Sequence, residues 1–283
     1  MSIRLRHPRR VVRRLLVAVA LAGVGATARP LAAQPSAAPD AAAPNASRDR
    51  WADSAARAVE AATARNDAGA LAGVRAVLGR ALALTPNDPL LQHYQGYAAY
   101  REAVARLAAG DKAGARRLLD EADGLLDRSG KRMPLAETFA LRSAVIGMQI
   151  GTGNPASGMW LGPRSNSAMD RAVALGPRNP RVWLLRGVGA FNAPSMWGGG
   201  NDKARDYLTR ALALFAGDRP AAPMPAWGEA EAHVWMGRTL QRAGDAAGAR
   251  AAYARALALQ PDNAWVSRVL VPSLDAAPGG AAR

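Results

Sequence analysis

Few residues in this chain of 283 could perform acid–base or metal chemistry. It has no cysteine and three histidines, which are His7, His93 and His233. No HExxH, GxSxG or GxxxxGK[ST] pattern occurs, and the neighbouring carboxylates of the acidic stretch 120–123 point in different directions on a helix. Because catalysis needs several converging groups, the sequence predicts a protein that is not an enzyme and that needs no metal or cofactor.

Two segments share an unusual mixture of Asn, Pro, Ser, Met-Trp and Gly, namely GTGNPASGMWLGP (151–163) and FNAPSMWGGGND (191–202). We expect both to be long insertions between paired helices. In one interpretation their tryptophans fold back and cap the ends of their own helix pairs. In the other, both loops emerge on one edge and frame an apolar pocket. The candidate binding residues here are Met159, Trp160, Met196 and Trp197.

Helices must position these segments, because Ala, Leu and Arg dominate the composition and residues typical of strands are scarce. One phrase recurs, as RALALTP (80–86), RAVALGP (171–177), RALALFAG (210–217) and RALALQP (255–261), and a related unit occupies 110–126. The five copies are spaced by 41, 50, 39 and 45 residues when aligned on Ala81, Ala122, Ala172, Ala211 and Ala256. Such recurrence predicts an all-α array of about five helical hairpins over residues 49–271.

The last copy resembles the tetratricopeptide repeat family, since Gly237 is followed by Ala249, Tyr253, Ala256 and Pro261 at the family's offsets of 12, 4, 3 and 5. The resemblance implies an α–α superhelix, or solenoid, of stacked hairpins. It also implies a binding scaffold for protein partners, because members are usually not enzymes.

In this family the first helix of each hairpin lines a concave groove, which implies a second set of candidate binding residues. Apolar and arginine side chains at these positions suit a peptide or an amphipathic ligand. The alternative is that the two tyrosines and the phenylalanine belong to the core between hairpins. The lysine and asparagine that clamp a carboxylate in chaperone-tail-binding members are absent. The candidates are Tyr97, Tyr100, Arg101, Leu184, Phe191, Arg238 and Arg242.

The stretch WGGGNDKARDYLTRALAL (197–214) looks like part of the periplasmic T-component of TRAP transporters, a tetratricopeptide-like helical protein. Those proteins are commonly lipid-anchored and have a pore for an apolar ligand. This chain has no cysteine to carry such a lipid.

Residues 1–33 are typical of a secretory signal peptide, with an arginine-rich start and a short apolar run. We expect cleavage after Ala33 or Ala28; a retained anchor is the alternative, although the run is shorter than the about 20 residues that span a bilayer. Removing 1–33 takes away seven arginines and lowers the formal charge from +15 to +8. Residues 34–48 are expected to be a disordered Ala/Pro-rich linker, and 272–283 a disordered tail.

Together these features predict a bacterial protein that is periplasmic or secreted. The leading interpretation is an exported scaffold that binds a protein or peptide partner of the cell envelope through its concave groove. The alternative is a periplasmic binding component for a small apolar ligand, held by the Met-Trp loops. Because the remaining charges are scattered over helix faces, we expect no nucleic-acid binding. After signal cleavage we expect no stable membrane anchor.

Overall fold

The structure is a computed structural model that describes residues 42–276. The predicted signal peptide, the first part of the predicted linker and residues 277–283 lie outside the described residues. Within 42–276 the chain forms helices and no strand. The helices are α1 (Ala42–Ala64), α2 (Ala68–Leu84), α3 (Pro89–Ala108), α4 (Lys112–Arg132), α5 (Ala136–Thr152), η1 (Pro155–Ser157), α6 (Gly158–Leu175), α7 (Pro180–Asn192), η2 (Ser195–Trp197), α8 (Asn201–Phe215), α9 (Glu229–Arg242), α10 (Ala246–Leu259), η3 (Val266–Leu270, a π-helix) and α11 (Val271–Ala276).

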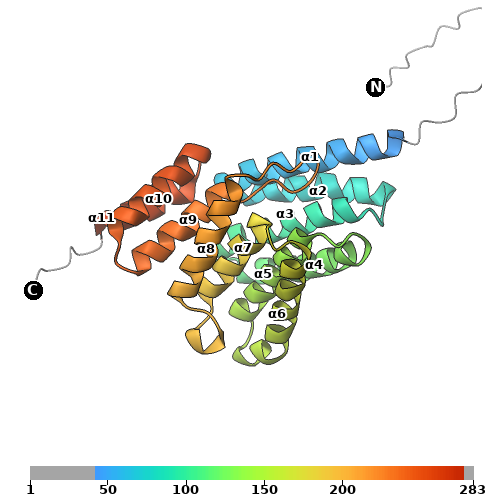
Figure 1. The fold of residues 1–283 in the computed structure, drawn as a ribbon. Helices are drawn as coiled ribbons and strands as arrows, with labels where there is room; N and C mark the ends of the chain where they lie inside the picture. The colour runs from blue at the N-terminus through green and yellow to red at the C-terminus, as the bar shows by residue number, and fades with distance from the viewer. Residues whose placement is uncertain (1–41, 277–283) are drawn as a thin grey trace, which may run out of the picture. The chain divides into compact units, whose positions relative to one another are not determined.

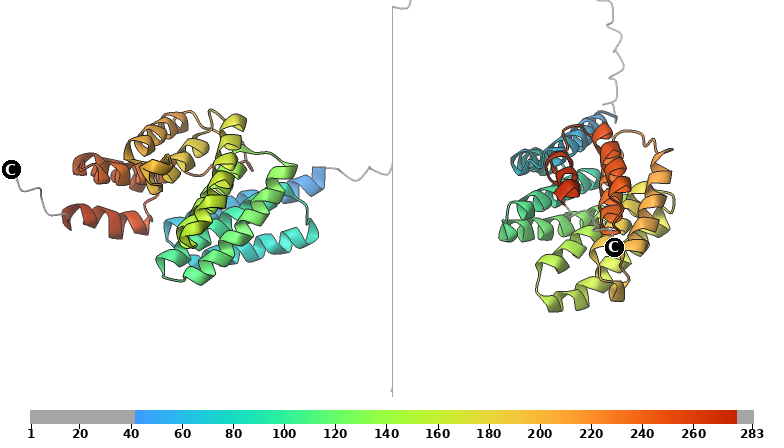
Figure 2. Two further views of the ribbon diagram at one scale, coloured as in Figure 1. Left: turned by 90° about the horizontal axis from the view of Figure 1, so that it is seen from below. Right: turned by 90° about the vertical axis from the view of Figure 1, so that its left-hand side faces the viewer.

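The helices pair in chain order as five hairpins: α1 with α2, α3 with α4, α5 with α6, α7 with α8, and α9 with α10. Each hairpin also packs on the next, and the first helices α3, α5, α7 and α9 contact one another in sequence. Figures 1 and 2 show the pairs following one another from blue to red. The predicted all-α array of about five tetratricopeptide-like hairpins is confirmed.

Local signals in the sequence explain where the helices begin. Side-chain oxygens of Asp67, Asp88, Asp111, Asn179 and Asp245 accept hydrogen bonds from backbone N–H groups in the first turns of α2, α3, α4, α7 and α10. Proline occupies the first position of α3 and α7, where no N–H is needed. The recurring phrase ends the second helix of four hairpins, α2, α6, α8 and α10, whereas the related unit 110–126 forms the first part of α4.

Small residues let the two helices of a hairpin approach closely. A β-carbon added to Gly237 on α9 would lie 2.4 Å from the ring of Tyr253 on α10. That distance is far below a normal contact, so only glycine fits there. The same relationship holds at 2.9 and 2.8 Å for two other pairs, Gly96 with Leu126 and Gly187 with Leu208. This packing explains why small residues recur at equivalent positions of the repeats.

Two predicted boundaries differ from the structure. Helix α1 begins at Ala42, so residues 42–48, assigned to a disordered linker, are helical. Residues 272–276 of the predicted tail continue as α11. Alanine-rich segments need only a neighbouring hairpin to stabilise them as helices, and α1 packs on both α2 and α3. No helix in this part of the chain has the length and apolar character needed to cross a membrane.

Only one of the two expected insertions is an extended connection. Residues 193–200 join α7 to α8, whereas α5 and α6 are separated only by 153–157. The rest of the first insertion is helical, and α6 accommodates Pro163 near its beginning. The longest connection, 216–228, joins α8 to α9 and was not singled out from the sequence.

Candidate functional site

The predicted groove residues on α3 are interior. Tyr97, Tyr100 and Arg101 are all buried. The Arg101 guanidinium donates two hydrogen bonds to the carboxylate of Glu231 on α9, one from Nη1 at 3.0 Å, and a third from Nη2 to the Tyr97 hydroxyl at 3.1 Å. The ring of Trp227 stacks on Tyr97 with centroids 4.9 Å apart. The α8–α9 connection and α9 therefore occupy the space that these residues were predicted to offer to a ligand.

Glu60 on α1 completes this interior network. Its carboxylate accepts a hydrogen bond from the Tyr97 hydroxyl at 2.5 Å and a longer one from Gln260 at 3.4 Å. Burial raises the pKa of Glu60, and the nearby Arg101 and Tyr97 only partly oppose that effect. Burial disfavours the charge of Arg101, but the Glu231 carboxylate outweighs it and holds the Arg101 pKa above its usual range. The network joins the first and last hairpins and is structural.

Leu184 of the predicted set is also a core residue. It is fully buried, and its Cδ2 atom would lie 2.8 Å from a β-carbon added to Gly228. Gly228 has a φ of 109°, a conformation that favours glycine, so the chain enters α9 directly over Leu184. The alternative of an inter-hairpin core therefore describes the structure for Tyr97, Tyr100 and Phe191, which are all buried. Leu184 is a further core residue.

The remaining predicted groove residues, Arg238 and Arg242, pack over the buried Phe191. With Trp235 and Trp265 these residues form what we call the arginine–aromatic face. The Arg238 guanidinium carbon lies 4.7, 4.4 and 5.1 Å from the ring centroids of Phe191, Trp235 and Trp265. Arg242 lies 3.3 Å from the Phe191 ring centroid and donates a 2.7 Å hydrogen bond to the Phe191 carbonyl. Helices α7 and α9, together with Trp265 immediately before η3, thus contribute to one surface.

Arg238 carries a charge that no carboxylate within residues 42–276 neutralises. Burial lowers its pKa; Tyr253 acts in the opposite direction and the neighbouring Arg242 lowers it further. Three ring centroids lie within 5.1 Å of its guanidinium carbon, and cation–π contact offsets part of the cost of burying it. Its N–H groups lie on the edge of that plane and are suited to a carboxylate or another anion.

The predicted Met-Trp residues form a second surface, which we call the Met–Trp edge. Met159 and Trp160 lie in the first turn of α6, while Met196 and Trp197 lie in η2. Their exposed fractions are 73%, 58%, 87% and 59% in that order. The two hairpin ends at 153–160 and 193–200 are here called the tips. A β-carbon added to Gly158 would lie 3.4 Å from the Trp197 ring, so the two tips are in contact. The tryptophans are therefore not buried caps, and both tips emerge on the same edge.

This edge projects outward, because each of its four large apolar side chains is more than half exposed. Two shallow hollows of about 410 Å³ lie elsewhere. One is lined by residues of α2, α3 and α4, including Gln92 and Leu125, and the other by Arg178 and the start of the α8–α9 connection. None of the candidate binding residues lines either hollow.

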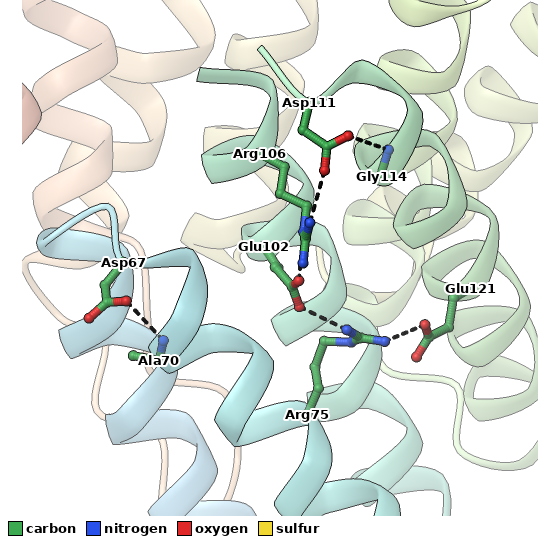
Figure 3. A network of polar contacts seen from close by, with 8 residues as sticks. All are labelled: Asp67, Ala70, Arg75, Glu102, Arg106, Asp111, Gly114 and Glu121. Atoms are coloured by element: carbon green, nitrogen blue, oxygen red, sulfur yellow. Dashed lines mark hydrogen bonds and ion pairs between the residues drawn. The ribbon is translucent and has the colours of Figure 1, made fainter. Parts of the chain in front are cut away.

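The main cluster of charged residues outside these surfaces is structural. Arg75 on α2 binds the carboxylates of Glu102 on α3, at 2.8 Å, and of Glu121 on α4 (Figure 3). Arg106 joins Glu102 to Asp111, which also caps α4. These contacts tie the first two hairpins together and pair the carboxylates of Glu102, Asp111 and Glu121. Among residues 42–276, no group of three His, Asp or Glu side chains is placed to hold a metal ion.

Two members of the arginine–aromatic face were missed in the sequence. Trp235, Arg238 and Arg242 are separated by three and four positions, a spacing that places side chains on one face of a helix. That pattern could have identified Trp235. Trp265 lies beyond the last repeat, where no pattern connects it to α9.

Comparison with known proteins supports the repeat assignment. Residues 230–263 match the tetratricopeptide repeat family. TTC0263, a thermophilic tetratricopeptide repeat protein of Thermus thermophilus, superposes with a TM-score of 0.54 at 21% identity, over 74% of this chain and 92% of its own. The HusA haemophore of Porphyromonas gingivalis superposes with a TM-score of 0.56 at 22% identity, over 68% and 94%. No curated protein matches by sequence.

The chain therefore contains a tetratricopeptide repeat and has the fold of tetratricopeptide repeat proteins. Scaffolds of this kind typically mediate binding to protein partners and are typically not enzymes.

Proposed function

We propose that this tetratricopeptide scaffold acts outside the cytoplasm and binds a peptide segment of an envelope protein through the arginine–aromatic face. The proposal rests on the surroundings of Arg238. Its guanidinium packs on three rings and has no carboxylate partner within residues 42–276. A peptide carboxylate would supply the missing charge. Arg242, exposed four positions later on α9, would add a second cation.

The chemistry of the face suits a peptide with a carboxylate beside an apolar side chain. Hydrogen bonds between an arginine and a carboxylate are among the stronger ones in proteins and can be bidentate. Trp265 is partly exposed next to Arg238 and offers apolar contact area. Tryptophan and arginine are also the residue types most often found at energetically important positions of protein interfaces.

The binding surface in this proposal is shorter than the groove expected from the sequence. Glu231 and Trp227 occupy the space at the α3 positions, which leaves the surface of α7, α9 and Trp265 for a partner. A segment of a few residues fits such a surface better than a long helix that would need the whole array.

Selection from a random dodecapeptide library tests this proposal. We expect the wild-type protein to select peptides rich in Asp or Glu, and we expect Arg238→Met to select few of them. Methionine keeps the apolar packing of the arginine stem. A melting temperature near that of wild type would confirm that the variant folds. Selection of uncharged peptides, or equal selection by both proteins, would contradict the proposal.

Export is the second part of the proposal and rests on the sequence of residues 1–33. The intact mass of the protein purified from the cell envelope should correspond to a chain that begins at Arg29 or Gln34. A mass that includes residues 1–28 would exclude cleavage of the predicted signal, without affecting the peptide-binding result.

A further inference from the structure

The Met–Trp edge is the most exposed apolar surface of the described residues. Of the ten large apolar side chains that are exposed, four lie here, and Met196 is the most exposed of all. A large apolar side chain left in water forgoes the favourable free energy of burial. Four such side chains at one edge indicate a contact surface.

The backbone is built to hold this edge in place. Gly198 and Gly200 have φ values of 85° and 120°, which few other residues adopt. A β-carbon on Gly199 would lie 2.0 Å from the carbonyl oxygen of Ala193, so this position also requires glycine. In the adjacent tip, Asn154 caps the η1 turn by accepting a hydrogen bond from the Ser157 N–H at 2.9 Å. Both tips thus have defined conformations.

The shape of the edge argues for a soft partner. Figure 1 shows the α5–α6 and α7–α8 connections as neighbouring tips at the lower edge of the helical array. A rigid protein would need cavities matched to both tips, whereas a lipid surface deforms around projecting side chains. Tryptophan is enriched where membrane meets water because its ring is apolar and its indole N–H can bond to polar groups.

Charges beside the tips fit an anionic lipid surface. Lys203 donates a hydrogen bond to the Gly198 carbonyl at 3.2 Å, which places its ammonium beside the second tip. Arg164 lies one turn beyond Trp160 and is half exposed, although it pairs with Asp123. Asp202 is a nearby carboxylate, but the chain without residues 1–33 still has a formal charge of +8. Basic residues near the surface add attraction to anionic headgroups.

We infer that the Met–Trp edge docks reversibly into the interfacial region of an anionic phospholipid membrane. The four apolar side chains enter the headgroup region, and Lys203 and Arg164 contact lipid phosphates. This inference is independent of the peptide-binding proposal, because the two surfaces share no residue.

Vesicle binding of the full chain tests it. Vesicles of phosphatidylcholine and phosphatidylglycerol with brominated acyl chains should quench tryptophan fluorescence of the wild type and of Leu84→Ser. Because the Trp160→Ser/Trp197→Ser variant lacks two of the reporting tryptophans, its affinity is measured by co-sedimentation with the same vesicles. The wild type and all variants share the basic N-terminal segment, so a difference in vesicle binding between them does not come from that segment. Leu84→Ser is the matched control, because Leu84 is 81% exposed and lies on α2.

We expect at least a tenfold loss of vesicle affinity in the double tryptophan variant, no loss in Leu84→Ser, and similar melting temperatures for all three proteins. Met159→Ser/Met196→Ser provides a second test if the tryptophan variant does not fold. Vesicle affinity that is unchanged in the double variants would overturn the inference. Two other results would also overturn the inference. One is a dimer, detected by light scattering, that is lost in the double tryptophan variant. The other is saturable binding of haemin without lipid that is lost in the same variant.

Discussion

Arg101 on α3 and Glu231 on α9 are separated by 130 positions in the chain and form an ion pair in the interior of the array. Removing one partner of a buried pair leaves the other uncompensated. We expect Arg101→Met to lower the free energy of unfolding by about 3–5 kcal/mol in urea denaturation.

The matched control is Arg250→Met, since Arg250 pairs with Asp275 at a well-exposed site. Exposed pairs contribute about 0–1 kcal/mol. Equal losses of stability in the two variants would mean that the Arg101 pair is not buried as described.

The repeat register predicts a site where charge is not tolerated. Ala256 is fully buried on α10, whereas Ala254 on the same helix is exposed. Ala256→Glu should therefore place a carboxylate between helices and lower the free energy of unfolding by about 3–5 kcal/mol, while Ala254→Glu should change it by less than about 0.5 kcal/mol. Chemical denaturation measures both. Similar stabilities of the two variants would show that the register is wrong.

The glycine run before α8 gives a third prediction. Gly199→Ala would place a β-carbon against the Ala193 carbonyl and should destabilise the protein by at least about 2 kcal/mol. Gly189 on α7 has open space around its α-carbon, so Gly189→Ala should be neutral or stabilise the helix by about 0.5–1 kcal/mol. Thermal unfolding of both variants tests this. A stable Gly199→Ala protein would contradict the conformation of the 193–200 connection.

The fold was largely predictable because each hairpin repeats a similar pattern of small and large apolar residues in the sequence. Gly237 and Tyr253 meet at a spacing that the sequence shows directly. The interior network was not predictable, because Glu60, Arg101 and Glu231 lie on three helices with no common period. Connection 216–228 is rich in proline and alanine, which conceals that its Trp227 stacks on Tyr97.

The candidate site was predictable in part for the same reason. Arg238 and Arg242 follow from the repeat positions, and the structure adds the rings that surround them. Exposure of Trp160 and Trp197 depends on how two hairpin tips meet, which no local pattern specifies.

His93 predicts a pH dependence of stability. It is fully buried and its Nδ1 lies 2.8 Å from the Thr138 hydroxyl oxygen. Burial, with a contribution from Arg181, lowers its pKa to about 3. Below pH 6.5 the unfolded chain binds a proton that the folded chain does not, so His93 contributes a loss of stability as the pH falls from about 6.5 towards 3.

The contribution of one such proton between pH 7 and pH 5 is about 2 kcal/mol. His93→Gln retains a polar side chain but does not titrate. Urea denaturation at pH 7 and pH 5 measures the fall in the free energy of unfolding between the two pH values. This fall should be smaller by about 2 kcal/mol in His93→Gln than in the wild type. The same fall in both proteins would mean that His93 is accessible to protons in the folded state.

The central claim is that Arg238 provides the charge that recognises a partner. Its most direct test is a titration of an acidic peptide from the library selection, followed by the fluorescence of Trp235 and Trp265, which flank Arg238. Arg116 on α4 is exposed and provides the control as Arg116→Gln. We predict that Arg238→Met weakens binding by at least about tenfold, or 1.4 kcal/mol, and that Arg116→Gln leaves it unchanged. Equal affinities for the wild type and Arg238→Met, or equal losses in the two variants, would contradict the claim.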